Sequence, residues 1–157
     1  MALLGTTRTK QDIANAILDL ASKKGQVVYG AQATNIHLPS HLKKKTKDYD
    51  ILTKKPEKAA QELAKRLNKL YGNGFKVEKA KYSKTFKVKD KFGKTIADYT
   101  ATTKKPKTKL VLGVKYASKD YQKKKIKKIL KDEASSFRWE KDVETLRRLR
   151  ESERKIW

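Results

Sequence analysis

The sequence contains no cysteine among its 157 residues. Disulfide bonds, thiolate metal sites and a cysteine nucleophile are therefore excluded, and the composition fits an intracellular protein. No apolar run approaches the roughly 20 residues that span a bilayer, so we expect no membrane partner. The segment from Met1 to Lys10 has neither the apolar stretch nor the cleavage site of a secretory signal. We therefore predict a cytoplasmic protein.

Acidic residues are also scarce, with 17 aspartates and glutamates against 41 lysines and arginines and a formal net charge of +24. Such an excess attracts polyanions, and nucleic acid is the usual one. A lysine-rich solvated surface is one alternative. A membrane surface is the weaker alternative, because no predicted helix pairs a basic face with a bulky aromatic face.

The densest positive charge falls on a predicted helix from Lys119 to Lys131. Tyr121, Ile126 and Ile129 are expected on its inner face. Its lysines are the predicted contacts to a phosphate backbone: Lys123, Lys124, Lys125, Lys127 and Lys128. Lysine contacts to phosphate do not distinguish base sequence, so we expect binding that is non-specific and sensitive to salt.

Helical and strand patterns alternate along the whole chain. The predicted helices cover about residues 7–22, 31–38, 56–70, 119–131 and 136–155, and the predicted strands cover 26–29, 49–53, 75–82, 86–88, 94–101 and 110–116. This order predicts an α+β fold in which a mixed or antiparallel sheet packs against helices. We expect one domain over residues 1–157, with its core at about 26–117 and C-terminal helices at about 118–157.

Two of the scarce acids alternate at the start of a predicted strand. Asp48 and Asp50 are two residues apart, so their side chains point to one face, about 6–7 Å apart. Carboxylates this close repel each other unless a cation lies between them. Mg²⁺ (or Mn²⁺) suits that place, because it binds carboxylates and leaves positions open for phosphate oxygens. A solvated acidic turn is the alternative.

Asp98 is a third acid, within an otherwise apolar predicted strand. A carboxylate in such a place needs a partner. The partner is either a buried lysine or arginine, or a metal shared with Asp48 and Asp50 if the two strands are neighbours. Two metals held by three carboxylates can activate a hydroxyl, orient a triphosphate and stabilise the leaving pyrophosphate.

Gly30 and Ala31 lie where a predicted strand turns into a helix. A glycine lets backbone N–H groups approach a bound anion closely, and the start of a helix adds positive potential. Junctions of this kind are common, so a purely structural turn is the alternative.

These parts occur in the order of a known family. Gly30-Ala31, then Thr46-Lys47-Asp48-Tyr49-Asp50-Ile51, then the distant Asp98 resemble the polymerase-β-type nucleotidyltransferase superfamily. The motif form is most similar to minimal viral nucleotidyltransferase-like proteins and to the catalytic domains of poxvirus poly(A) polymerases. The resemblance covers about residues 26–149 and implies a nucleotidyltransferase-like fold.

By position, the resemblance implies that Asp48 and Asp50 bind both metal ions. Asp98 would bind the catalytic ion and help to activate the acceptor hydroxyl, and Gly30 and Ala31 would offer backbone donors to the triphosphate. The chain departs from the family at Ala31, where many active members have a serine that also contacts phosphate. It also has no room for the acceptor-recognition domains of larger polymerases, so a partner subunit is implied.

We therefore expect a metal-dependent nucleotidyltransferase. It would move a nucleoside monophosphate from a nucleoside triphosphate to a hydroxyl, with a polynucleotide as the expected acceptor. The alternative is a catalytically inactive protein of the same fold, which binds nucleic acid non-specifically as a virion component.

Overall fold

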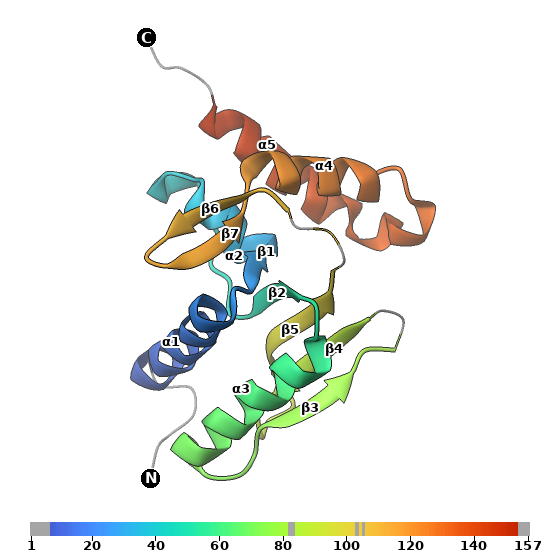
Figure 1. The fold of residues 1–157 in the computed structure, drawn as a ribbon. Coiled ribbons are helices and arrows are strands. Elements are labelled where there is room, and N and C mark those ends of the chain that lie inside the picture. The colour runs from blue at the N-terminus through green and yellow to red at the C-terminus, as the bar shows by residue number, and fades with distance from the viewer. Residues whose placement is uncertain (1–6, 82–83, 103, 105, 154–157) are drawn as a thin grey trace.

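A mixed sheet of seven strands forms the centre of the molecule in the computed structural model, which describes residues 7–81, 84–102, 104 and 106–153 (Figure 1). The order across the sheet is β3-β4-β5-β2-β1-β7-β6. β1 is parallel to β7 and β2 is parallel to β5, while the other neighbouring pairs are antiparallel. The strands are β1 (Val27–Tyr29), β2 (Tyr49–Thr53), β3 (Lys76–Lys79), β4 (Thr85–Lys89), β5 (Thr95–Ala101), β6 (Thr108–Val111) and β7 (Val114–Ala117).

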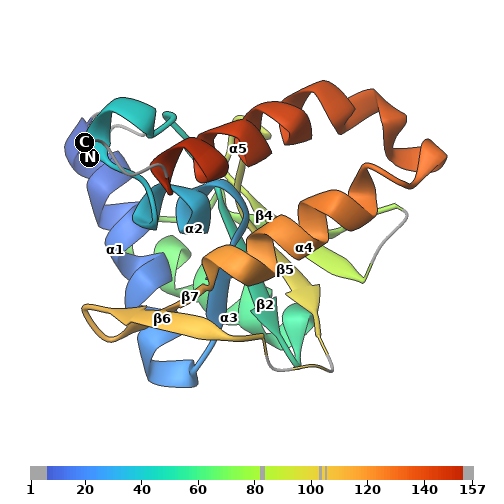
Figure 2. The same cartoon turned by 90° about the horizontal axis from the view of Figure 1, so that it is seen from above.

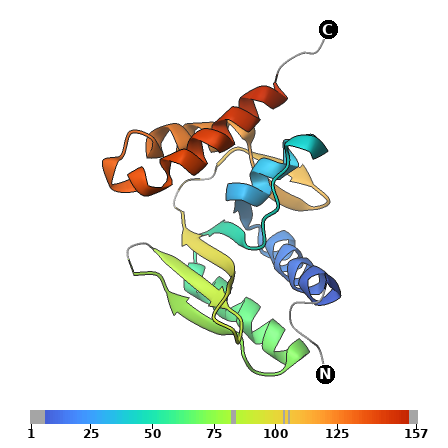
Figure 3. The same cartoon turned by 180° about the vertical axis from the view of Figure 1, so that it is seen from behind.

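Five α-helices pack around this sheet. From above, α4 and α5 lie side by side (Figure 2), and the view from behind shows them at the end of the molecule away from α3 (Figure 3). The helices are α1 (Thr7–Lys24), α2 (Gly30–Ile36), α3 (Pro56–Tyr71), α4 (Lys119–Ile129) and α5 (Trp139–Ser152), with 3-10 turns at Ser40–Leu42 and Glu133–Arg138. The predicted α+β class with a mixed sheet packed against helices is confirmed.

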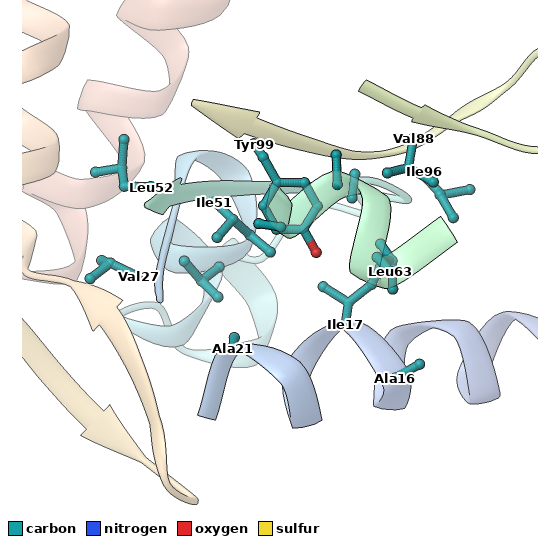
Figure 4. Close-up of a cluster of buried hydrophobic side chains, with 14 of the residues drawn as sticks. Ala16, Ile17, Ala21, Val27, Ile51, Leu52, Leu63, Val88, Ile96 and Tyr99 are labelled. Atoms are coloured by element: carbon teal, nitrogen blue, oxygen red, sulfur yellow. The ribbon is translucent and has the colours of Figure 1, made fainter. Parts of the chain in front are cut away.

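The main core lies between the sheet and the pair α1 and α3. Ile17 of α1 and Leu63 of α3 meet Ile51 of β2 and Tyr99 of β5, and each of these side chains is at most 1% exposed (Figure 4). Burial of a side chain of this size contributes about 1.5–3 kcal/mol. This packing holds β2 and β5 rigidly side by side, and these two strands carry the predicted acids.

A second, smaller core joins the C-terminal helices to the rest of the chain. Leu38, which follows α2, packs with Ile126 of α4 and with Leu146 and Leu149 of α5. The ring nitrogen of Trp139 also donates a hydrogen bond of 2.8 Å to the Ile129 carbonyl. The second core therefore fixes α4 across the junction between β1 and α2.

Several predicted boundaries differ from the structure, most clearly at residues 110–116. There the chain forms a hairpin of β6 and β7 in place of one strand, because Leu112 and Gly113 turn with φ of 49° and 81°. Positive φ at both turn positions is the geometry of a tight two-residue hairpin, which leucine rarely adopts. The predicted strand 75–82 is β3, and its residue 82 lies outside the described residues, as do residues 154–157 of the predicted C-terminal helices.

Among the described residues, none of the helices is both long enough and apolar enough to cross a membrane.

Candidate active site

Two parallel strands bring the predicted acids together. Asp50 of β2 lies opposite Asp98 of β5 in the register of the pair. Asp48 comes just before β2 and shares a face with Asp50 because side chains alternate along a strand. One carboxylate oxygen from each of the three lies within 4.8 Å of the others, and all three residues are half-buried. Within the described part of the chain, no other group of three potential metal ligands gathers this closely.

The three carboxylates are electrostatically unfavourable without a cation. Burial raises the pKa of Asp50 to about 6, and the charges of Asp98 and Asp48 add to the shift. Burial also raises the pKa of Asp98, where the positive charge of Lys87 opposes the shift and Asp48 reinforces it. A hard divalent cation relieves this repulsion, because it favours the ionised form of every carboxylate that it contacts.

Asp98 has a lysine beside it, but the contact is incomplete. The Lys87 Nζ lies 3.7 Å from the Asp98 Oδ1, which is within ion-pair range and too long for a hydrogen bond. That buried Oδ1 has no hydrogen-bond partner among the described residues. The sequence left two partners open for Asp98, a lysine or arginine and a shared metal. Both are present in part, because Asp98 pairs with Lys87 and also converges with the other two acids. The unpartnered oxygen fits a metal ligand.

The Gly30 backbone packs directly against the Asp50 side chain. Its φ is +67°, and a Cβ at this position would collide with the Asp50 side chain. Only glycine combines that backbone conformation with so close an approach. The turn at Gly30 and Ala31 therefore places backbone directly beside Asp50. The predicted role of this turn as a source of backbone donors to a triphosphate stays a prediction.

Gln122 of α4 fastens the C-terminal helices to this turn. Its Nε2 lies within hydrogen-bond distance of the Gly30 carbonyl at 2.8 Å and of the Thr34 Oγ1 at 2.9 Å. Thr34 in turn donates to the Gly30 carbonyl at 3.1 Å. Gln122 is only 4% exposed, so loss of its amide would leave buried polar groups without partners.

Lys125 brings a positive charge to the carboxylates. Its Nζ lies 3.7 Å from the centroid of the Tyr29 ring, which is the geometry of a cation–π contact. Burial lowers the pKa of Lys125 to about 8, and the charge of Asp50 opposes this shift. The Tyr29 hydroxyl is anchored to the Thr100 Oγ1 at 3.1 Å. The ring therefore holds the ammonium group beside the acids.

Asp48 and Asp50, the Gly30 turn, Gln122 and Lys125 line one cavity of ≈ 210 Å³ between the sheet and helices α4 and α5, whereas Asp98 lies behind its lining. Arg138 also faces it and makes two hydrogen bonds with the nearly buried Asp142, at 2.8 and 3.0 Å. The wall is thus acidic on the strand side and basic on the helix side. The residues that line it include Tyr29, Gly30, Ala31, Asp48, Asp50, Gln122, Lys125, Arg138 and Asp142.

The five lysines predicted to contact nucleic acid do not form one surface. Lys125 points into the cavity, and Lys123 pairs with Glu153 of the C-terminal segment. The other three are exposed on the outer side of α4, namely Lys124, Lys127 and Lys128. Their role in nucleic-acid binding stays a prediction.

Sequence reasoning missed Tyr29, Gln122 and Arg138, and it assigned Lys125 to the outer face. Helical spacing contained a signal for Lys125, because Gln122 lies three residues before it and Ile129 four residues after it on the same side of α4. Gln122 is a neutral residue among the lysines of α4, and its position indicated the side of the helix that faces the sheet. For Arg138 the sequence contained no such signal.

No family model matches this chain and no curated protein matches it, whereas solved structures do. The Megavirus polyadenylate synthase aligns with 96% of the chain at 19% identity and a TM-score of 0.80, and the chain spans 33% of that protein. JHP933 from Helicobacter pylori aligns with 92% at 16% identity and a TM-score of 0.55, over 66% of its own length. An antigenic nucleotidyltransferase-like protein from Paracoccidioides brasiliensis has 16% identity over 88% of this chain and 75% of its own, with a TM-score of 0.47.

The likeness to the Megavirus protein covers nearly all of this chain, although the chain corresponds to about a third of that protein's length. The sequence predicted a fold of the polymerase-β nucleotidyltransferase type, and the shared arrangement of sheet and helices confirms it. The chain has a nucleotidyltransferase-like fold.

Proposed function

We propose that the protein is a metal-dependent nucleotidyltransferase that moves a nucleoside monophosphate from a nucleoside triphosphate to a hydroxyl of a polynucleotide. The observation that carries the proposal is the convergence of the Asp48, Asp50 and Asp98 oxygens within 4.8 Å. Asp50 lies against the Gly30 turn, and Asp48 and Asp50 line a small cavity together with Lys125.

The donor set fits Mg²⁺ or Mn²⁺. It consists of carboxylate oxygens alone, it includes the buried and unpartnered Oδ1 of Asp98, and Asp48 and Asp50 open toward the cavity. Asp48, Asp50 and Asp98 would hold the metal. A divalent ion at such a site supplies electrostatic stabilisation of the charge that develops on the transferred and leaving phosphates.

The cavity suits the phosphates of a nucleotide better than the whole molecule. Its ≈ 210 Å³ is below the ≈ 300–1,000 Å³ of pockets that enclose a complete small ligand. Backbone N–H groups at Gly30 and Ala31 would donate to phosphate oxygens, and Lys125 would neutralise part of their charge. The sugar and base would then lie outside this cavity.

In the transfer step, the acceptor hydroxyl oxygen forms a bond to the α-phosphorus. The bond from that phosphorus to the oxygen bridging the α- and β-phosphates breaks, and pyrophosphate leaves with the electron pair. Asp98 would take the hydroxyl proton, while Gly30, Ala31 and Lys125 would hold the triphosphate in line for the attack. Positioning and charge stabilisation of this kind are the main contributions of the protein in phosphoryl transfer.

The test is a comparison of Asp48→Asn with Asp12→Asn, an exposed aspartate on α1 that serves as the matched control. Calorimetric titration of Mn²⁺ and ATP measures binding, and extension of a labelled RNA measures transfer. We expect Asp12→Asn to behave as the wild type and Asp48→Asn to lose metal-dependent ATP binding and transfer. Transfer that survives in the double variant Asp48→Asn and Asp50→Asn would refute the proposal.

Ala31 favours a second candidate function. Without the serine hydroxyl at this position the cavity has one phosphate donor fewer, and the chain has a net charge of +24. A protein of this fold without catalysis would bind nucleic acid through its lysines as a virion component. Metal-independent RNA binding with no ATP binding in the wild type would select this alternative.

Recognition of the acceptor in the enzyme would need further protein surface. We propose that a partner subunit adds to the surface of this domain that contacts the acceptor. Nucleoside triphosphates are intracellular metabolites, and we therefore place the activity in the cytoplasm.

A further inference from the structure

A second cavity, of ≈ 580 Å³, lies at the opposite ends of β1 and β2 from the Gly30 turn and concentrates positive charge. Among its described lining residues Glu62 is the only acid, and it already has Lys24 at 3.8 Å. We call this the lysine cavity. Its six lysines are Lys24, Lys54, Lys55, Lys58, Lys104 and Lys115, all of them exposed to solvent.

The start of α3 adds to the positive potential of the lysine cavity. α3 has 16 residues, and Lys55 at its N-cap makes no side-chain capping bond. The first N–H groups of a helix have no partner within the helix, and Pro56 contributes no N–H. Lys55, Lys58 and Ala59 line the cavity. The open helix end therefore adds to the charge of the lysines.

Gln26 gives an independent sign of a missing partner. It lines the lysine cavity and is 6% exposed, and its Oε1 has no hydrogen-bond partner among the described residues. A buried hydrogen-bond acceptor without a donor destabilises the folded protein by about 1–3 kcal/mol. A ligand with hydroxyl or amino donors next to its phosphates would complement such a wall.

The lysine cavity lies at the end of the sheet, and part of its lining shares the sheet face that carries the acids. Leu52 lines the cavity and lies two residues beyond Asp50 on β2, while Val27 lies two residues before Tyr29 on β1. Side chains two residues apart in a strand point to the same face, about 7 Å from each other. A chain of phosphates in the lysine cavity therefore needs only a short extension to reach the carboxylates.

We propose that the lysine cavity binds the phosphate groups of a single-stranded polynucleotide and leads its terminal hydroxyl to Asp48, Asp50 and Asp98. The role of the strand as acceptor rests on the proposed transferase function, whereas its binding does not. A flexible phosphodiester strand fits these features of the cavity. Its successive phosphates contact several cations, which the six lysines and the open start of α3 provide, and its own donors complement Gln26.

The experiment compares two triple variants that each remove three positive charges. The first changes Lys54, Lys58 and Lys115 to Gln in the lysine cavity. The matched control changes Lys65 and Lys69 of α3 and Lys76 of β3 to Gln, which are exposed and line neither the lysine cavity nor the cavity beside the acids. Affinity for fluorescent oligouridylate is measured by anisotropy over a range of salt concentrations, in EDTA and without nucleotide. Thermal melting verifies that both variants are folded.

We expect the cavity variant to bind roughly 10- to 100-fold more weakly, with a salt slope reduced by about 2. The control should stay within about threefold of the wild type. An equal loss in both variants would overturn the lysine cavity as the site, because only total charge would then matter. That result would leave the transferase proposal intact, since loss of transfer in Asp48→Asn tests it separately.

A competition experiment distinguishes a polynucleotide strand from a free polyphosphate as the ligand of the lysine cavity. Inorganic tripolyphosphate should displace oligouridylate weakly, because it reaches fewer lysines at once. If tripolyphosphate bound the wild type as tightly as the oligonucleotide and lost affinity in the cavity variant, a free polyphosphate would be the ligand. The assignment of a polynucleotide would then be wrong.

Discussion

Asp50→Asn is predicted to stabilise the metal-free protein while abolishing the proposed transfer activity. Folding buries the Asp50 carboxylate beside two other acids and raises its pKa from 3.8 to about 6. A carboxylate whose folded pKa is raised holds its proton more tightly in the native state. The native state therefore loses stability as the pH rises from the unfolded pKa to the folded pKa, and the full penalty applies above about pH 6.

A shift of this size corresponds to about 3 kcal/mol. The Asp50 side chain keeps some contact with solvent, so we expect a gain of about 2 kcal/mol in the free energy of unfolding for the variant near pH 7. For a chain of this size, that gain raises Tm by about 4–8 °C. Near pH 4 the difference should nearly vanish, because the wild-type carboxyl is then largely protonated in the native state.

Urea unfolding in EDTA at the two pH values measures the effect, with Asp12→Asn as the control expected to stay within about 0.5 kcal/mol. Mg²⁺ should then stabilise the wild type more than Asp50→Asn, because only the wild type has the complete set of ligands. A variant that is less stable than the wild type near pH 7 would show that burial and repulsion of the charged carboxylate do not destabilise the metal-free protein. The reasoning about the metal site would then lose its electrostatic basis.

Gly30→Ala should lose nearly all transfer activity and at least 1–2 kcal/mol of stability from backbone strain, measured by urea unfolding. Gly72→Ala is its control, since Gly72 has a similar φ of +78° with nothing within 4 Å; equal effects of the two changes would show that the collision with Asp50 is unimportant. Gln122→Ala should cost about 1–3 kcal/mol and raise the KM for ATP, because the bond to the Gly30 carbonyl is lost; an unchanged KM would contradict this coupling. Lys125→Met, which keeps most of the side-chain volume, should weaken ATP binding about tenfold with little change in Tm, and unaltered ATP affinity would remove Lys125 from the phosphate site.

The shared face of Asp48 and Asp50 was predictable because it depends on local geometry. Alternation along a strand puts Asp48 and Asp50 on one face whatever the rest of the fold does. Asp98 needed one further condition, that β5 is the neighbour of β2, and the sequence alone does not establish which strands are neighbours. The register that pairs Asp50 with Asp98 depends on the packing of α1 and α3 beneath both strands.

The placement of Lys125 was not predictable from its residue type. Lysine is among the residues least often buried, so a lysine within a run of lysines is expected to face solvent. Its burial depends on the Tyr29 ring and on Asp50, which are more than 70 residues away in the sequence. The hairpin at Leu112 escaped prediction for a similar reason, since the turn places a leucine at positive φ against its intrinsic preference.

The candidate site is assembled from two packing units of unequal size. The main core fixes β1, β2 and β5, and with them the carboxylates, whereas Lys125 is held by α4 through the smaller core around Ile126 and Leu149 and through Gln122. Helices held by fewer buried contacts separate from the rest of the structure at a lower free-energy cost than unfolding of the main core. The proposed triphosphate, between the acids and Lys125, would contact both units, so its binding would raise the free energy needed to separate α4 and α5 from the sheet. On this proposal, substrate binding stabilises the arrangement of the two units that forms the site.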